Sequence, residues 1–145
     1  MKQATFYLLS QPDNGELSVA ETLACELAAK AWREGKRVLI ACETEQQAFA
    51  IDEALWARNP DDFVPHNLSG ESTPYPTPIE ISWAGKRNAQ RRDLLISLQR
   101  QIPDFVASFN QVIDFVPTDE TEKAIARERY KQYRQMGWQL ATENA

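Results

Sequence analysis

Histidine and cysteine are scarce in this chain of 145 residues, which contains one histidine and two cysteines. Because His66 has no second histidine as a partner, histidine-rich metal sites and Ser-His or Cys-His catalytic pairs with a spare histidine are nearly excluded. Cys25 and Cys42 are not spaced as a C-x-x-C pair, and each stands among apolar neighbours. We therefore expect two reduced, buried thiols and a loop histidine that donates to the backbone.

Long apolar runs and an excess of positive charge are also missing. No window approaches the roughly 18 uncharged apolar residues of a membrane span, and the N-terminal segment lacks the features of a secretory signal. Sixteen Lys and Arg residues face 21 Asp and Glu residues, a net charge of −5. This balance disfavours a general DNA-coating role, so any site for nucleic acid or an acidic partner is expected to be local. The missing membrane span and secretory signal lead us to expect a cytosolic protein.

Glycine is too sparse, at five residues, to supply a phosphate-binding loop. A phosphate-binding loop has a glycine five residues before its Gly-Lys pair. Lys30 stands at that position before Gly35-Lys36, and Glu80 stands at that position before Gly85-Lys86. Residues 10–18 contain a single glycine, so the dinucleotide fingerprint is missing as well. No carboxylate pair is placed to converge on a substrate. The sequence thus predicts no catalytic, cofactor or metal site.

Short apolar runs alternate with stretches of helical periodicity along the chain. The predicted strands are residues 4–9, 37–42, 79–83, 94–98 and 111–116, with 63–67 as an extended edge segment and 79–83 alternating as a half-buried strand. The first strand is expected to be central, and the run at 37–42 suits a strand buried on both faces of a parallel sheet.

Helix signals fill the intervals between these strands. Capping-box spacing at Ser18 and Thr44 predicts two helices, the first ending before Gly35 and the second with Ala48, Ile51 and Leu55 as its core stripe. Residues 103–109 predict a short helix and residues from 119 onward a terminal one, whereas five prolines make 59–78 mostly non-helical. We therefore predict an α/β fold for residues 1–145, a single domain with a mainly parallel sheet flanked by helices.

Basic residues gather in two windows, 85–100 and 123–134, which together hold ten of the sixteen Lys and Arg residues. On the terminal helix, four basic residues and one aromatic residue share a face: Lys123, Arg127, Tyr130, Lys131 and Arg134. A separate stripe of apolar residues is expected to face the core: Ile125, Tyr133, Met136 and Leu140. Such a face suits a carboxylate-rich peptide, because arginine can hold a carboxylate at two points. An ordinary solvated helix side remains the alternative.

A second unusual surface is predicted on the helix that follows Thr44. Phe49 and Trp56 are seven residues apart and lie off the core stripe, and Phe63-Val64-Pro65 follows in the connection. Together they indicate an apolar patch for a protein partner, with burial under the long connection as the alternative. The residues alone leave two classes open: an adaptor with two protein-binding faces, favoured by the overall acidity, and a direct single-stranded nucleic-acid binder.

Several strings, spread in order over nearly the whole chain, carry a family resemblance. They are ATFYLL, GKRVLIAC, DEALWAR, FVPHNL-x-GE, RRDLLISL, DFVP and ARERYK-x-YR. In these the chain resembles the chi subunits of bacterial DNA polymerase III holoenzyme. The resemblance implies a non-catalytic replication subunit, cytoplasmic and associated with the nucleoid, with a nucleotide-binding-like fold but no nucleotide site.

The resemblance also implies partners and the residues that meet them. A 1:1 complex with the psi subunit, which links chi to the clamp loader, would involve Trp56 and Phe63, and a helicase would use the same face in some family members. The acidic C-terminal tail of the single-stranded DNA-binding protein would bind at Val116, Lys123, Arg127 and Tyr130. Neither the residues nor the resemblance decides whether Arg91-Arg92 contacts DNA.

Overall fold

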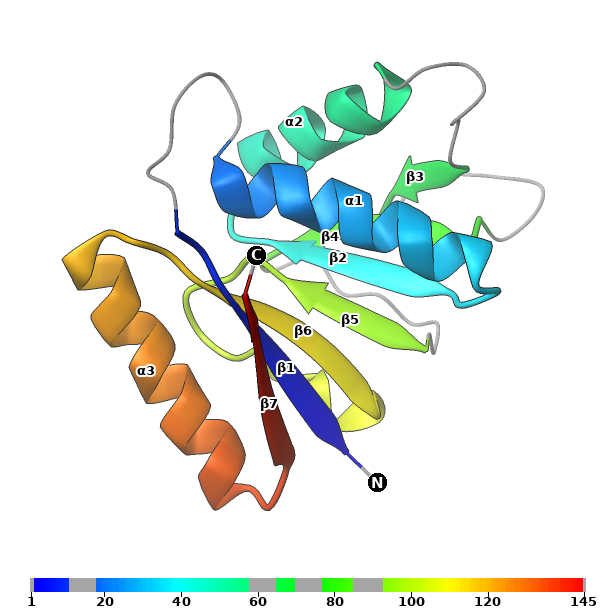
Figure 1. Cartoon of the computed structure of the whole chain (residues 1–145). Helices are drawn as coiled ribbons and strands as arrows, with labels where there is room; N and C mark the ends of the chain where they lie inside the picture. The colour runs from blue at the N-terminus through cyan, green and yellow to red at the C-terminus, as the bar shows by residue number, and fades with distance from the viewer. Residues whose placement is uncertain (1, 11–17, 58–64, 70–76, 85–92, 145) are drawn as a thin grey trace.

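The computed structural model describes residues 2–10, 18–57, 65–69, 77–84 and 93–144 (Figure 1). Along the chain its elements are β1 (Gln3–Leu8), α1 (Val19–Arg33), β2 (Val38–Cys42), α2 (Glu45–Trp56), β3 (His66–Leu68), β4 (Ile79–Trp83), β5 (Leu94–Ser97), a short 3-10 helix (Val106–Ser108), β6 (Gln111–Val116), α3 (Glu120–Gln135) and β7 (Gln139–Asn144). The seven strands form one sheet in the order β3-β4-β2-β5-β6-β1-β7. Every neighbouring pair is parallel, which confirms the predicted α/β class.

The described helices cover both faces of this sheet. Helices α1 and α2 lie on one face and α3 lies on the other (Figure 1). Two buried clusters follow from this division: one joins α1 and α2 to β2, β4 and β5, and the other joins Tyr133 of α3 to Phe6 of β1 and Val112 of β6. Strand β2 is buried along its whole length, as its unbroken apolar run predicts.

The helix ends match the capping signals in the sequence. Ser18 Oγ accepts a hydrogen bond from the amide of Glu21 at 3.1 Å, and Thr44 Oγ1 accepts one from Gln47 at the same distance. Gln47 Oε1 in turn accepts a hydrogen bond at 2.7 Å from the amide of Glu43, the residue before the N-cap. After α1, Gly35 takes a φ of +84°, a left-handed conformation that side chains other than glycine disfavour.

Two strand predictions need correction. Strand β4 is not half-buried: Ile79 to Ser82 are all buried, because β4 lies between β3 and β2 inside the sheet. The buried Glu80 carboxylate accepts a hydrogen bond from the Ser69 hydroxyl at 2.6 Å. Strand β1 is flanked on both sides, by β6 and β7, but it is next to the edge strand rather than at the centre.

The chain after α3 was also predicted wrongly, since residues 139–144 form β7 rather than a continuation of the helix. Gly137 takes a φ of +85° and lets the chain turn back so that β7 pairs with β1. Leu140 therefore belongs to a strand, and Met136 is 49% exposed. The buried face of α3 consists of Ala126, Arg129 and Tyr133.

Candidate partner-binding site

A pocket of about 390 Å³ opens between α3 and the carboxyl ends of β1 and β6. Its lining combines apolar side chains with two cations: Phe6, Leu8, Leu9, Val116, Pro117, Lys123, Ala126, Arg127, Tyr130 and Thr142. All four residues predicted for the tail site are among them. The sequence indicated the α3 members by their periodicity, whereas β1 and β7 reach the pocket only through strand pairing.

The apolar wall of the pocket belongs to the body of the protein. Phe6 is fully buried, and its ring meets the Tyr130 ring edge to face with centroids 5.3 Å apart. Leu8 of β1 pairs in register with Val116 of β6, which places both at the strand ends beside α3. The floor is therefore built by two paired strands, and Tyr130 is supported from behind by a core aromatic ring.

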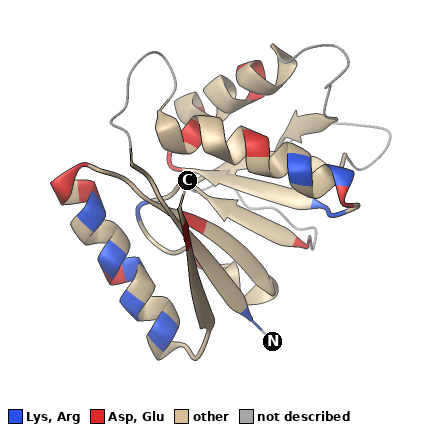
Figure 2. Ribbon diagram, in the orientation of Figure 1, with Lys and Arg blue, Asp and Glu red and all other residues tan. Residues whose placement is uncertain are grey.

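The cations of the pocket come from successive turns of α3. Lys123 has its ammonium 3.7 Å from the exposed Glu120 carboxylate, a weak pair at the surface. Arg127 is exposed, and the described residues include no hydrogen-bond or ion-pair partner for it. Lys131 and Arg134 follow in the second half of α3, and Figure 2 shows basic residues along the length of this helix. The site thus pairs an apolar recess with a cation that is free to bind an anion.

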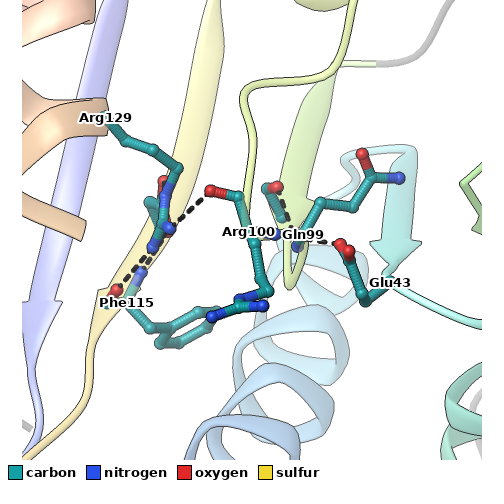
Figure 3. Close-up of polar contacts among 7 residues, drawn as sticks. Glu43, Gln99, Arg100, Phe115 and Arg129 are labelled. Carbon is teal, nitrogen blue, oxygen red and sulfur yellow. Dashed lines mark hydrogen bonds and ion pairs between the residues drawn. The ribbon is translucent and has the colours of Figure 1, made fainter. Parts of the chain in front are cut away.

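One arginine of α3 has an entirely different environment. Arg129 is 7% exposed, and it forks onto Asp114 of β6 through Nε at 2.8 Å and Nη2 at 3.0 Å. Arg129 also donates to the carbonyls of Arg100 at 2.9 Å and Phe115 at 3.1 Å (Figure 3). Burial raises the pKa of Asp114, and the Arg129 guanidinium and the Phe115 amide oppose that shift. The sequence analysis counted Arg129 in the basic window 123–134 and left it off the cationic face, but it did not predict this pair.

Further hydrogen bonds continue from this pair across the strand ends (Figure 3). The Arg100 amide donates to the Glu43 carboxylate at 2.9 Å, and Gln99 Nε2 donates to the Cys42 carbonyl at 3.1 Å. A cleft of about 500 Å³ lies here, where nucleotides bind in many parallel sheets. Its lining carboxylates, Asp114, Asp119 and Glu122, outnumber its two arginines, so its charge is unsuited to a phosphate.

The second predicted surface contains exposed aromatic rings on α2. Phe49 is 45% exposed and Trp56 is 60% exposed, so neither is covered as a core residue would be. The Phe49 ring lies 6.3 Å from that of Trp83, and Trp56 meets His66 edge to face at 5.1 Å. His66 lies on β3 and not in a loop, and its Nε2 is 3.2 Å from an Asp52 carboxylate oxygen. Phe63, the second residue predicted for this face, lies outside the described residues, as do Arg91 and Arg92.

Both cysteines lie in the core cluster on the side of the sheet that α1 and α2 cover. Cys25 and Cys42 are buried and are not joined in a disulfide, as predicted. Burial raises the pKa of the Cys42 thiol, with a smaller contribution from Glu21. Across residues 2–10, 18–57, 65–69, 77–84 and 93–144, no group of three or more His, Cys, Asp or Glu side chains could hold a metal ion. Within the same ranges, no helix has the length and apolar character needed to span a membrane.

Fold and site together define a parallel α/β domain that presents an apolar pocket with basic residues at one end of its sheet. The family model of the DNA polymerase III chi subunit, HolC, matches residues 1–141. The DNA polymerase III subunit chi of Haemophilus influenzae is 65% identical over 143 residues, which cover 99% of this chain and 97% of that protein. The Escherichia coli subunit is 54% identical over 143 residues, covering 98% and 97% respectively.

This chain therefore belongs to the family of DNA polymerase III chi subunits, which are accessory subunits of the replication polymerase. Among solved structures, it superposes on the crystal structure of T4 UvsW with a TM-score of 0.65 at 12% identity. That match covers 99% of this chain and 41% of the other, and it shows similarity of fold alone.

Proposed function

We propose that this chain is a non-catalytic, single-domain adaptor of the polymerase holoenzyme, acting in the cytoplasm at the replisome. One face binds the acidic C-terminal tail of the single-stranded DNA-binding protein, and another pairs 1:1 with the psi subunit, which links the chain to the clamp loader. The observation that carries the tail proposal is the pocket beside α3, where apolar walls adjoin Lys123 and Arg127.

The proposed ligand is a peptide end with several carboxylates and one apolar side chain. Arg127 holds the terminal carboxylate, because its guanidinium can donate to both oxygens at once. Lys123 meets an upstream acidic side chain, and Val116 with Tyr130 encloses the apolar side chain. Support for these roles comes from the exposure of Arg127 and from the buried Phe6 ring behind Tyr130.

The test is a titration of the tail peptide and of a single-stranded oligonucleotide, each against the wild type and Arg127→Ala. Losing a charge-assisted contact of roughly 1.5–3 kcal/mol should weaken peptide binding about tenfold or more. Arg134→Ala is the matched control, because it removes the same residue type from the same helix at a position outside the pocket lining. We expect that control to change the affinity less than threefold.

Salt and the oligonucleotide separate this proposal from its rival. Peptide binding should weaken as salt is added, since exposed charges are screened. If the chain instead bound DNA directly, the naked oligonucleotide would bind tightly and the peptide would not. That result would overturn the adaptor proposal.

The psi pairing is proposed for the surface that contains Trp56 and Phe63. Exposed aromatic side chains are common anchors of protein interfaces, and Trp56 combines a large ring with high exposure. A helicase that used the same face would compete with psi, so the two partners would exclude each other.

The adaptor role further implies that the chain alone neither hydrolyses ATP nor extends a primer. The sequence lacks both phosphate-loop motifs, which supports this part of the proposal. Hydrolysis above the blank that disappears with a single substitution in the purified chain would contradict it.

A further inference from the structure

We infer that the buried pair of Arg129 and Asp114 positions the two walls of the tail pocket, although neither residue lines it. The inference rests on the proposed tail binding and adds a positioning role that the pocket residues themselves do not supply. Arg129 belongs to α3 and Asp114 to β6, the same two elements that provide Arg127, Tyr130 and Val116.

The pair lies close in sequence to the residues that it would position. Asp114 precedes Val116 by two residues on β6, so both side chains point to the same face of the sheet. Arg129 follows Arg127 by two residues and precedes Tyr130 by one. A shift of α3 along or about its axis would therefore move Arg127 and Tyr130 relative to Val116, and would change the width of the pocket.

The geometry of the pair resists such a shift. The guanidinium donates to both Asp114 oxygens and to two backbone carbonyls, and Asp114 Oδ1 also accepts from the Phe115 amide at 2.7 Å. A planar fork with this many fixed acceptors tolerates little translation or rotation. Apolar contacts at Ala126 and Tyr133 hold α3 to the sheet too, but apolar burial is non-directional and defines the orientation less sharply.

A stabilising role alone is the competing explanation. Buried ion pairs often add no stability over apolar side chains of similar volume, because both charges lose their hydration. What such a pair does provide is a defined geometry. Here that geometry is imposed at the junction of the two pocket walls, which favours positioning over stability as its role.

The test replaces both partners with apolar residues, in the double variant Arg129→Met/Asp114→Leu. We expect a native near-UV spectrum, psi affinity within twofold of the wild type, and tail-peptide affinity lowered at least fivefold. Arg100→Met is the control, because it removes an exposed ion pair to Glu122 of α3 (2.9 Å) and leaves the buried fork in place. That control should bind the peptide within twofold of the wild type.

The slope of peptide affinity against salt distinguishes positioning from direct contact. Lys123 and Arg127 remain in the double variant, so the slope should equal that of the wild type while the affinity is lower at every salt concentration. A shallower slope would mean that Arg129 itself contacts the peptide, which would overturn the positioning role. Peptide affinity within twofold of the wild type would overturn it as well.

A second variant covers the case in which the double variant loses its native spectrum. Arg129→Lys keeps the positive charge but cannot form the two-point fork. We expect this variant to bind the peptide at least fivefold more weakly than the wild type does. If it bound with wild-type affinity, the positioning role would be overturned and the proposed tail binding would stand. If the wild-type chain failed to bind the peptide, the proposed function would be overturned and the inference with it.

Discussion

Trp56 offers the sharpest test of the proposed psi surface, because it is 60% exposed in the isolated chain. An aromatic side chain of this size presents up to about 250 Å², so about 150 Å² remains for a partner to cover. At about 25 cal/mol per Å², covering that area contributes about 3–4 kcal/mol as an upper bound. Ordering of interface side chains costs about 0.5–1.5 kcal/mol each. Trp56→Ala should then weaken psi binding by about 2–3 kcal/mol, or about 30- to 150-fold.

The assay is calorimetric titration of purified psi into the wild type and two single variants. Met136→Ala is the matched control, since Met136 is 49% exposed and caps the C-terminal end of α3, a helix on the opposite face of the sheet from α2. We expect less than a threefold change for that control. Native near-UV spectra would establish that Trp56→Ala has not disturbed the core through its contact with His66.

Two outcomes would refute this reasoning. Equal weakening by Trp56→Ala and Met136→Ala would show that exposed apolar area, and not this particular surface, governs the interaction. Unchanged affinity in Trp56→Ala, with psi still bound 1:1, would place the interface elsewhere. A loss of tail-peptide binding of the same size in Trp56→Ala would indicate a general structural defect.

Two further predictions concern stability. The Tyr133 hydroxyl is buried and has no hydrogen-bond partner among the described residues. Tyr133→Phe should therefore raise the free energy of unfolding by about 1 kcal/mol and the Tm by about 2–4 °C. A lower free energy of unfolding for the variant, measured by urea denaturation, would show that the hydroxyl is hydrogen-bonded. Burial raises the pKa of the Cys42 thiol in the folded state. The stability that the neutral buried thiol contributes is therefore complete below the unfolded-state pKa of about 8.5, and above that pH the free energy of unfolding falls by up to about 1.4 kcal/mol per pH unit. Cys42→Ala should therefore flatten the fall in stability between pH 8.5 and 10 in denaturation series, and an unchanged slope would contradict the assignment.

Local signals account for the part of the fold that the sequence predicted well. Both capping boxes begin helices where expected, and residues 111–116 form β6 with the predicted bounds. These features depend on neighbours within a few residues, so they can be recognised without the tertiary structure. The parallel arrangement also followed from local patterns, because a strand that is apolar throughout needs cover on both faces.

Features that depend on distant partners were predicted less well. Strand β7 carries a weak apolar pattern, and it forms because Gly137 ends α3 and the chain then pairs with β1. The extension of the core stripe to Met136 was wrong for the same reason. Leu140 does pack against the core, but it does so from β7 and not from the helix. Phe6 and Thr142 were not predicted as pocket residues, since only the strand order β6-β1-β7 brings them beneath α3.

The contrast between Arg127 and Arg129 explains why residue type and local charge were insufficient to define the site. The two point in directions about 160° apart around α3, so one faces solvent and the other faces the sheet. Asp114 is the signal that could have separated them, because a carboxylate inside the apolar run QVIDFV needs a buried cation nearby. Arg129 is neutralised by that partner, which leaves Lys123 and Arg127 as the cations that line the pocket. Helical periodicity had already placed Lys123, Arg127, Lys131 and Arg134 on one face without Arg129. Burial gives the reason for that omission, because the Arg129 guanidinium is held by Asp114 inside the protein.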